Sequence, residues 1–295
     1  MKKYKNPVGV SRFTGLILIS PFIIGSVLFI IYPFFCSFVT GMTKYDGIHP
    51  PEFIGLENYK NMLNDNHFLK ALGVTFKYTV IFVPLKLTVS LLTAILLSTD
   101  IKGIGFFRTA FYIPSILGSN LAVAIMWQYL FTRNGLANQF LEIIGVSGVS
   151  WYGDQKYALF IIILLRLWEF GSTMIIFLTA LKEIPRECYE AARVDGCGSV
   201  RAFFGITLPL LKNTLFVNAI LQTISALQEF SAPYMITGGN PMKSTYTVGM
   251  LIYDEMFSYH NAGYANAVSW VLFMLTASVV CIMFRITGRI RKEIP

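Results

Sequence analysis

Hydrophobic and polar positions alternate along this chain in long blocks. Six apolar segments are each long enough to cross the hydrocarbon core of a bilayer, which is about 30 Å thick. These segments are Phe13–Val39, Val74–Leu97, Ala110–Phe131, Tyr157–Leu181, Leu215–Ile236 and Ala265–Phe284. The pattern predicts an all-α, polytopic membrane protein with six transmembrane helices. We expect residues 1–295 to form a single membrane domain.

Composition supports placing most of the chain in lipid. Of its 295 residues, 55% are hydrophobic and only 14% are charged, whereas about a quarter are charged in a typical soluble protein. The first apolar run follows Lys2, Lys3 and Lys5, but it is too long for a cleaved signal sequence and no small-x-small site follows it. The four cysteines are scattered without disulfide or metal-ligand spacing.

Basic residues set the expected orientation. Six spans place both termini on one side, where fifteen Lys and Arg residues lie against six on the other side. Positive charge accumulates on the cytoplasmic side of membrane proteins, so we expect both termini in the cytoplasm. The net charge of +8 is thereby explained by topology, and nucleic acid is not an expected partner.

Charged residues occur deep within the fourth span. Arg166 and Glu169 lie about half-way across it, at a spacing of i, i+3, with Thr173 one turn further. A charge at mid-span costs at least ~2.5 kcal/mol on insertion scales, so these groups should have partners or water. Two interpretations stay open: a neutralising pair that locks helices together, or part of a polar pathway.

Polar stripes mark two further spans. Lys86 in the second span forms an i, i+4, i+7 stripe with Ser90 and Thr93. The fifth span carries a stripe that we expect to run on one helix across the bilayer, with Gln228 beside it: Thr214, Asn218, Gln222, Ser225 and Glu229. The four deep charges, Lys86, Arg166, Glu169 and Glu229, sum to zero. A neutral polar lumen suits an uncharged, hydroxyl-rich solute.

The outer loops contain short amphipathic segments. After the first span, Tyr59, Met62, Leu63 and Phe68 are expected to form one face of a helix. Such a helix could lie on the membrane surface or contact an external protein. A second amphipathic piece lies in the loop between the third and fourth spans, and Thr237–Pro241 predicts a tight turn after the fifth.

One cytoplasmic loop, residues 184–213, is unusually rich in regularly spaced charge. Pro185 can start a helix, which we expect over Arg186–Val194. Asp195-Gly196-Cys197-Gly198 should end it, since glycine readily takes a positive φ, and a second short helix should begin at Ser199. The loop could dock into a partner protein or lie as an amphipathic helix on the membrane.

Motifs for chemistry within the chain are missing from the sequence. It contains no G-x-x-x-x-G-K-[ST], H-E-x-x-H or G-x-S-x-G sequence. We therefore expect the chain not to be an enzyme and to bind no cofactor itself. Any energy source should be a separate protein.

The cytoplasmic loop resembles a known family signature. Tyr189-Glu190-Ala191-Ala192, then Asp195-Gly196, then Ile206-Thr207-Leu208-Pro209 are similar to the EAA motif of permease subunits of binding-protein-dependent ABC importers. Weaker similarities point to the sugar-type, maltose-permease F-like branch, and they occur at Phe53–Tyr59, at Trp127 with Gly135 and Asn138, at Thr237–Gly239 and at Gly263–Ala265. Cys197 stands where the family usually has Ala, and Asn240-Pro241 departs from the usual Gly-Gly-Pro.

The resemblance implies a type I ABC importer permease fold in a bacterial plasma (inner) membrane. It implies that a coupling helix sits in a groove of an ATPase subunit, through Tyr189, Glu190, Ala191, Ala192, Asp195 and Gly196. The implied partners are a second, homologous permease subunit forming a heterodimer, an ABC ATPase dimer that uses ATP and Mg, an extracytoplasmic solute-binding protein, the sugar substrate and membrane lipid.

Substrate contacts are expected on the third, fourth and fifth spans. The resemblance implies Ser119, Asn120, Trp168, Glu169, Gln228 and Glu229, and the polar stripes add Arg166 and Ser225. The leading hypothesis is ATP-driven import of a sugar, with an oligosaccharide preferred. The alternative is an ion- or proton-coupled secondary transporter that uses Glu169 and Arg166, although no inverted repeat is visible. A membrane-embedded enzyme or sensor is a third hypothesis.

Overall fold

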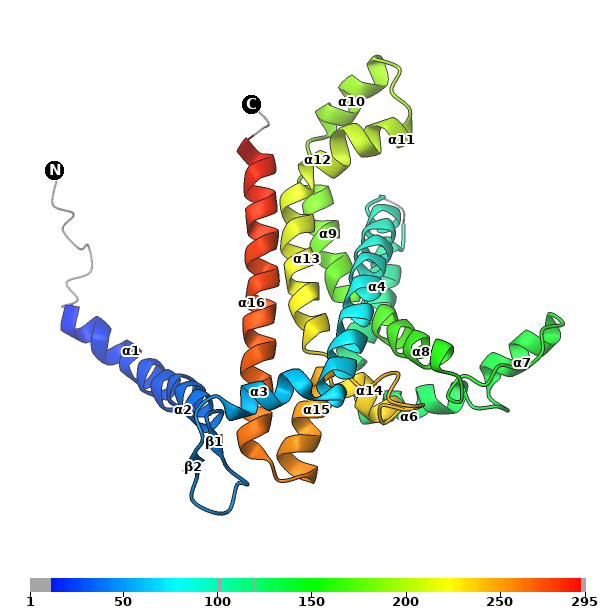
Figure 1. Cartoon of the computed structure of the whole chain (residues 1–295). Coiled ribbons are helices and arrows are strands. Elements are labelled where there is room, and N and C mark those ends of the chain that lie inside the picture. Colours follow the sequence, from blue (N-terminus) through cyan, green and yellow to red (C-terminus); the bar gives the residue numbers. More distant parts are fainter. Residues whose placement is uncertain (1–11, 100–101, 119, 293–295) are drawn as a thin grey trace. The chain divides into compact units, whose positions relative to one another are not determined.

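The structure of the protein is a computed structural model that describes residues 12–99, 102–118 and 120–292. The chain divides into two compact units. The first comprises residues 1–62 and 255–270, and the second comprises residues 63–254 and 271–295. The described residues are mostly helical (Figure 1), which confirms the all-α prediction.

The first unit contains the N-terminal span. Helix α1 (Arg12–Ser26), a π-helical turn η1 (Val27–Ile31) and α2 (Tyr32–Thr40) follow one another directly, and Gly15–Thr40 is long and apolar enough to cross a membrane. Phe34 and Phe38 pack against Trp270 at ring distances of 4.6 and 4.8 Å. Trp270 belongs to the first part of α16 (Ala262–Lys292).

A short β-hairpin follows this span. Strands β1 (Thr43–Lys44) and β2 (Glu52–Phe53) pair antiparallel. The Asn58 side chain donates hydrogen bonds to the carbonyls of Gly41 and Thr43. Asn58 lies on α3 (Glu57–Asn64).

The predicted face of the outer-loop helix is wrong in part. Met62 is buried as expected, but Leu63 is exposed. Phe68 belongs to the next helix, α4 (Asn66–Leu97), because the Asp65 side chain accepts a hydrogen bond from the His67 N–H and starts a new helix there.

The second unit is built around α4. Against it pack α9 (Gly171–Lys182) and α13 (Lys212–Leu227), and Figure 1 shows these three helices side by side. The unit further contains α5 (Ile104–Leu117), α6 (Leu121–Leu130), α7 (Leu136–Ile143), α8 (Gln155–Trp168), α14 (Ser231–Ile236) and α15 (Val248–Tyr253). A π-helical turn, η3 (Asp254–Ser258), follows α15.

Three of the six predicted spans are broken rather than continuous. Within the described residues, Gly15–Thr40, Asn66–Leu97 and Ala262–Thr287 could each cross a membrane alone, and three bent helix pairs bring the possible number to 6. The third predicted span is divided into α5 and α6, and the Asn120 side chain caps α6 by accepting from Ala122 N. The fourth is divided into α8 and α9, which meet at 46°.

The fifth predicted span, Leu215–Ile236, is wrong as a single helix. Helix α13 ends at Leu227 and α14 begins at Ser231. The Glu229 carboxylate accepts a hydrogen bond from Ala232 N, and its carbonyl accepts one from Thr247 Oγ1. These side-chain bonds satisfy backbone groups that a helix break exposes. The expected stripe from Thr214 to Glu229 therefore does not run along one helix.

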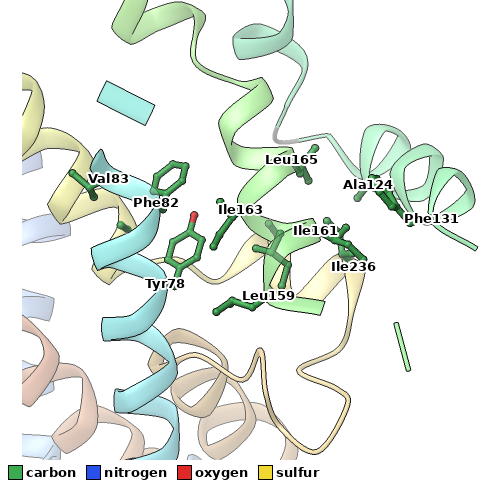
Figure 2. Close-up of a cluster of buried hydrophobic side chains, with 13 residues drawn as sticks. Tyr78, Phe82, Val83, Ala124, Phe131, Leu159, Ile161, Ile163, Leu165 and Ile236 are labelled. Carbon is green, nitrogen blue, oxygen red and sulfur yellow. The ribbon is translucent and has the colours of Figure 1, made fainter. Parts of the chain in front are cut away.

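The core of the second unit lies where the broken spans meet α4. Figure 2 shows Tyr78 and Phe82 of α4 beside Ile163 of α8, with Ala124, Phe131 and Ile236 further along the same cluster. Tyr78 and Phe82 are stacked, with ring centroids 5.1 Å apart. Apolar packing of this kind positions the polar groups described below.

The charged loop of residues 184–213 folds as predicted over its first half. Helix α10 covers Arg186–Val194, Gly196 has φ +73°, and α11 (Ser199–Ala202) begins at the expected residue. A π-helical turn η2 (Phe203–Thr207) and α12 (Leu208–Leu210) then lead to α13. The axis bends by 69° between residues 199–210 and α13. After α14, Gly238 and Gly239 both take positive φ, which confirms the predicted turn.

Candidate translocation site and coupling surface

A buried ion-pair network lies at the centre of the second unit. Arg166 Nη1 donates to Glu169 Oε2 at 2.9 Å, and Arg166 Nη2 donates to Glu229 Oε1 at 2.8 Å. Arg166 Nε also lies 2.8 Å from Glu229 Oε2. The side chains of Arg166, Glu169 and Glu229 are 13%, 10% and 7% exposed. We call these three residues the Arg166 network.

The network joins the three helix breaks. Glu169 lies at the break between α8 and α9, and Glu229 lies at the break between α13 and α14. At the third break, a Cβ added to Gly118 would lie 2.1 Å from Glu169 Cδ. Only a glycine permits this approach, so the α5 end of the break packs directly on the carboxylate. The Ser90 hydroxyl of α4 donates to the carbonyl of Phe170 at 3.4 Å.

The fourth deep charge, Lys86, is buried on the same helix as Tyr78. Its Nζ lies 5.2 Å from the centroid of the Phe82 ring, a cation–π distance. Lys86 and Ser90 are buried and Thr93 is half-buried. The stripe on α4 therefore faces other helices, as predicted. The charges of Lys86 and of the three residues of the Arg166 network sum to zero.

Other predicted pathway residues lie outside the network. Trp168 is half-buried against Trp127, with ring centroids 5.9 Å apart. Asn120, Ser225 and Gln228 are exposed. Ser119 lies outside the described residues. The structure thus brings Arg166, Glu169 and Glu229 together but not the whole predicted set.

The polar stripe of α13 packs against α9. Gln222 Nε2 donates to Thr173 Oγ1 at 3.1 Å, which links the two helices. Asn218 is fully buried and donates to the carbonyl of Thr214 at 3.1 Å. These contacts favour a helix-locking role for Asn218 and Gln222 in this conformation.

The Arg166 network can fasten helices, but its chemistry does not include an obvious catalytic function. Its one arginine and two carboxylates carry a net charge of −1, which the nearby Lys86 offsets, and the carboxylates lie at two of the helix breaks. Among the described residues, no group of three or more His, Cys, Asp or Glu side chains could hold a metal ion. Both interpretations of the Arg166–Glu169 pair stay compatible with this conformation. The pair locks helices together, and it does so near the polar stripes of α4 and α13.

The predicted coupling residues divide between two faces of α10. Glu190, Ala191, Asp195 and Gly196 are exposed, and Tyr189 and Ala192 are half-buried. The exposed face carries the carboxylates of Glu190 and Asp195, whereas the other face holds the helix to its own unit.

Tyr189 anchors α10 through its hydroxyl. The Tyr189 hydroxyl and Thr207 Oγ1 are 2.9 Å apart, which links α10 to η2. Between α10, η2 and the ends of α4 and α9 lies a cleft of about 370 Å³, lined on those helices by Ile95 and Leu181. The hydroxyl pair thus attaches α10 to η2, which continues through α12 into α13.

Two loops contain ionisable groups with shifted pKa values. Asp46 accepts hydrogen bonds from the N–H groups of Ile48 and His49, and its Oδ2 lies 2.6 Å from His49 Nδ1. The hydrogen bond between the two side chains lowers the pKa of Asp46 and raises the pKa of His49. Burial raises the pKa of Tyr152 to about 12, and its hydroxyl donates to the carbonyl of Gln128.

Comparison with known proteins identifies the family. Residues 10–292 match the model of the family described as binding-protein-dependent transport system inner membrane component. The chain belongs to this family. It is thus a multi-pass membrane permease rather than an enzyme.

Individual relatives and a solved structure agree with this assignment. The chain is 39% identical over 289 residues to the probable ABC transporter permease protein YesP of Bacillus subtilis, covering 97% of this chain and 93% of the relative. It is 34% identical over 286 residues to the trehalose/maltose transport system permease protein MalF of Thermococcus litoralis, covering 95% of each. The fold matches a bacterial alginate ABC transporter, solved in complex with an alginate pentasaccharide-bound periplasmic protein, with a TM-score of 0.80, 19% identity and 94% and 95% coverage. This confirms the type I permease fold.

Gly118, which packs on Glu169, could not be identified from the sequence. A glycine in an apolar run gives no signal of which side chain packs on it. Asn138 makes hydrogen bonds to three backbone carbonyls and accepts two more. The sequence resemblance includes Gly135 and Asn138, and these hydrogen bonds show that Asn138 organises the connections of α7.

Proposed function

We propose that this chain is the permease subunit of an ATP-driven ABC importer that translocates a sugar, with an oligosaccharide preferred. ATP would be hydrolysed by a separate ATPase dimer. A second, homologous permease subunit would complete the membrane part, and a solute-binding protein would deliver the sugar from outside. The chain would act as one membrane domain with both termini in the cytoplasm.

The observation that carries the proposal is the form of α10. The helix has the predicted bounds, presents Glu190 and Asp195 to solvent, and is held to the spans by Tyr189. A helix that is exposed on one face and anchored on the other can pass a partner's movement to the membrane helices. The missing nucleotide-binding motif in the sequence supports a separate ATPase.

The sugar part of the proposal has two supports. The MalF relative is named for trehalose and maltose transport, and these substrates are uncharged and rich in hydroxyl groups. The four deep charges of this chain sum to zero, which suits such a solute better than an ion. Uncharged hydroxyls are recognised by hydrogen bonds, which the exposed Asn120, Ser225 and Gln228 can supply.

The Arg166 network would work as a fastener in the transport cycle. It holds together the ends of three broken helices. The sugar could therefore pass this region only if at least one ion pair of the network separates. ATP-driven movement of α10 would shift α9 and α13, which contribute to two of the breaks. Binding and hydrolysis would then favour different arrangements of the same helices, as alternating access requires.

Reconstituted transport tests this proposal. The chain would be assembled in liposomes with its partner permease, ATPase and binding protein, and uptake of a panel of labelled mono- and oligosaccharides would be measured. We expect uptake that needs ATP and the binding protein and that is insensitive to an uncoupler. Uptake by the chain without ATPase, abolished by an uncoupler, would contradict the proposal and support a secondary transporter.

A further inference from the structure

Helix α7 carries an apolar face that no described part of its own unit covers. Leu136, Phe140 and Ile143, at i, i+4 and i+7, are 64%, 66% and 81% exposed. Ile144, directly after the helix, is also exposed. Positions four and seven residues apart lie on one side of a helix, so these side chains form a continuous surface. We call them the α7 apolar face. Figure 1 shows α7 standing out from the helices of the second unit.

The opposite side of α7 is fixed to the protein by Asn138. The Asn138 side chain donates to the carbonyls of Arg133 and Val149 at 3.0 Å, and its Oδ1 accepts from Val149 N and Trp151 Nε1. Asn138 is 1% exposed. These bonds tie both connections of α7 to the helix itself. The direction of the apolar face is therefore set by the fold.

The short connection to α6 keeps α7 close to a helix of a candidate membrane segment. Only five residues, 131–135, separate α6 from α7, so the start of α7 lies within about 20 Å of the end of α6. Helices α5 and α6 together are apolar enough for a membrane segment and are bent by 102°, as in a broken span or a re-entrant loop. Leu121, Ile125 and Tyr129 of α6 are exposed, and their four-residue spacing places them on one side of the helix. Tyr129 is a residue type typical of the membrane–water interface.

We propose that the α7 apolar face lies in the outer leaflet of the bilayer, as an interfacial anchor continuous with the lipid-facing side of α6. Two observations favour lipid over another protein. The face contains no charged or hydrogen-bonding side chain, which a specific protein interface of this type usually includes at its rim. It also adjoins the exposed, mainly apolar side of α6, a helix whose pair with α5 is apolar enough for a membrane segment. A short amphipathic helix in this setting buries its apolar side at the boundary of headgroups and acyl chains.

This inference goes beyond the proposed function, since it assigns a lipid contact that transport itself does not require. Its consequence is mechanical: an anchored α7 would hold the loop between α6 and α8 at a constant depth while the helix breaks at the Arg166 network rearrange. When α10 moves, the anchor would hold the loop between α6 and α8 in place. The movement would then rearrange the helix breaks instead of displacing the whole loop.

Spin-label accessibility tests the anchor. In a background where Cys36, Cys188, Cys197 and Cys281 are replaced by Ser, single cysteines would be introduced as Phe140→Cys and Ile143→Cys and labelled. Glu142→Cys, exposed on another side of α7, is the matched control. The full chain, alone and assembled with its partner permease and ATPase, would be placed in lipid nanodiscs. Collisions with oxygen, which concentrates in lipid, and with a water-soluble nickel chelate would then be compared.

We expect the labels at 140 and 143 to favour oxygen over nickel, at a depth of about 5–10 Å below the headgroups, and the label at 142 to favour nickel. High nickel accessibility at 140 and 143 would overturn the proposal, because the face would be in water. Low accessibility to both reagents only in the assembled state would assign the face to the second permease. A change in label accessibility when the binding protein is added to the assembled transporter would assign the α7 apolar face to the binding protein. None of these readings depends on sugar uptake, so a failure here is distinct from a failure of the proposed function.

Discussion

Replacement of Arg166 by Met should strongly destabilise the chain. Glu169 and Glu229 are 10% and 7% exposed, and each would lose its only cationic partner within the network. Removing one partner of a buried ion pair costs about 3–5 kcal/mol, because an uncompensated charge stays buried. For a chain of this size, 1 kcal/mol corresponds to roughly 2–4 °C in melting temperature. We therefore expect the apparent Tm to fall by about 10 °C.

The assay is thermal denaturation in lipid nanodiscs, followed by intrinsic fluorescence, with two further variants. Arg193→Met removes an exposed arginine of α10 and should leave the apparent Tm nearly unchanged. Lys86→Met and Arg166→Met combined with Glu169→Gln and Glu229→Gln remove all four buried charges, so that no uncompensated charge stays buried, and should recover most of the loss. An Arg166→Met variant as stable as the wild type, or a quadruple variant less stable than Arg166→Met alone, would refute the account of the network.

Three further predictions concern separate parts of the chain. Gly118→Ala should displace the Glu169 carboxylate and lower stability by about 1–3 kcal/mol, the usual cost of overpacking, whereas Gly105→Ala, which has open space around it, should not; thermal denaturation compares the two. Asn138→Ala should cost at least about 1–3 kcal/mol, because it leaves buried backbone groups unsatisfied, and proteolysis should then cut the loop before α8 sooner than in the wild type. Asp46→Asn should lower the pKa of His49, as measured by NMR titration. In the wild type, the stabilisation from His49 is present at low pH and is lost as the pH rises through its raised pKa. The stabilisation from Asp46 is instead lost as the pH falls through its lowered pKa.

The sequence predicted some elements closely because local chemistry determines them. Pro185 and Gly196 mark the two ends of α10, and its bounds of Arg186–Val194 agree with the structure. The first, second and last spans were also found, since a long apolar run without capping groups forms a continuous helix. Their predicted boundaries differ from the helices mainly where the helices extend into polar loops.

The broken spans could not be predicted in the same way. Their breaks lie within apolar runs, where the hydropathy pattern is unchanged. Glu229 ends α13 because it is bonded to Arg166 and Ala232 and because Thr247 satisfies its carbonyl. Those partners come from distant parts of the chain. Charge at mid-span correctly indicated that Arg166 and Glu169 have partners, but not that a third residue completes the network.

The central claim is that α10 couples a partner ATPase to the membrane helices, and charge reversal on its exposed face tests it most directly. ATP-dependent sugar uptake would be measured for Glu190→Lys and, as a matched control, for Glu183→Lys, which is exposed before α10 begins. The account predicts that Glu190→Lys abolishes uptake while the transporter still assembles, and that Glu183→Lys retains it. Normal uptake by an assembled Glu190→Lys transporter would contradict the claim.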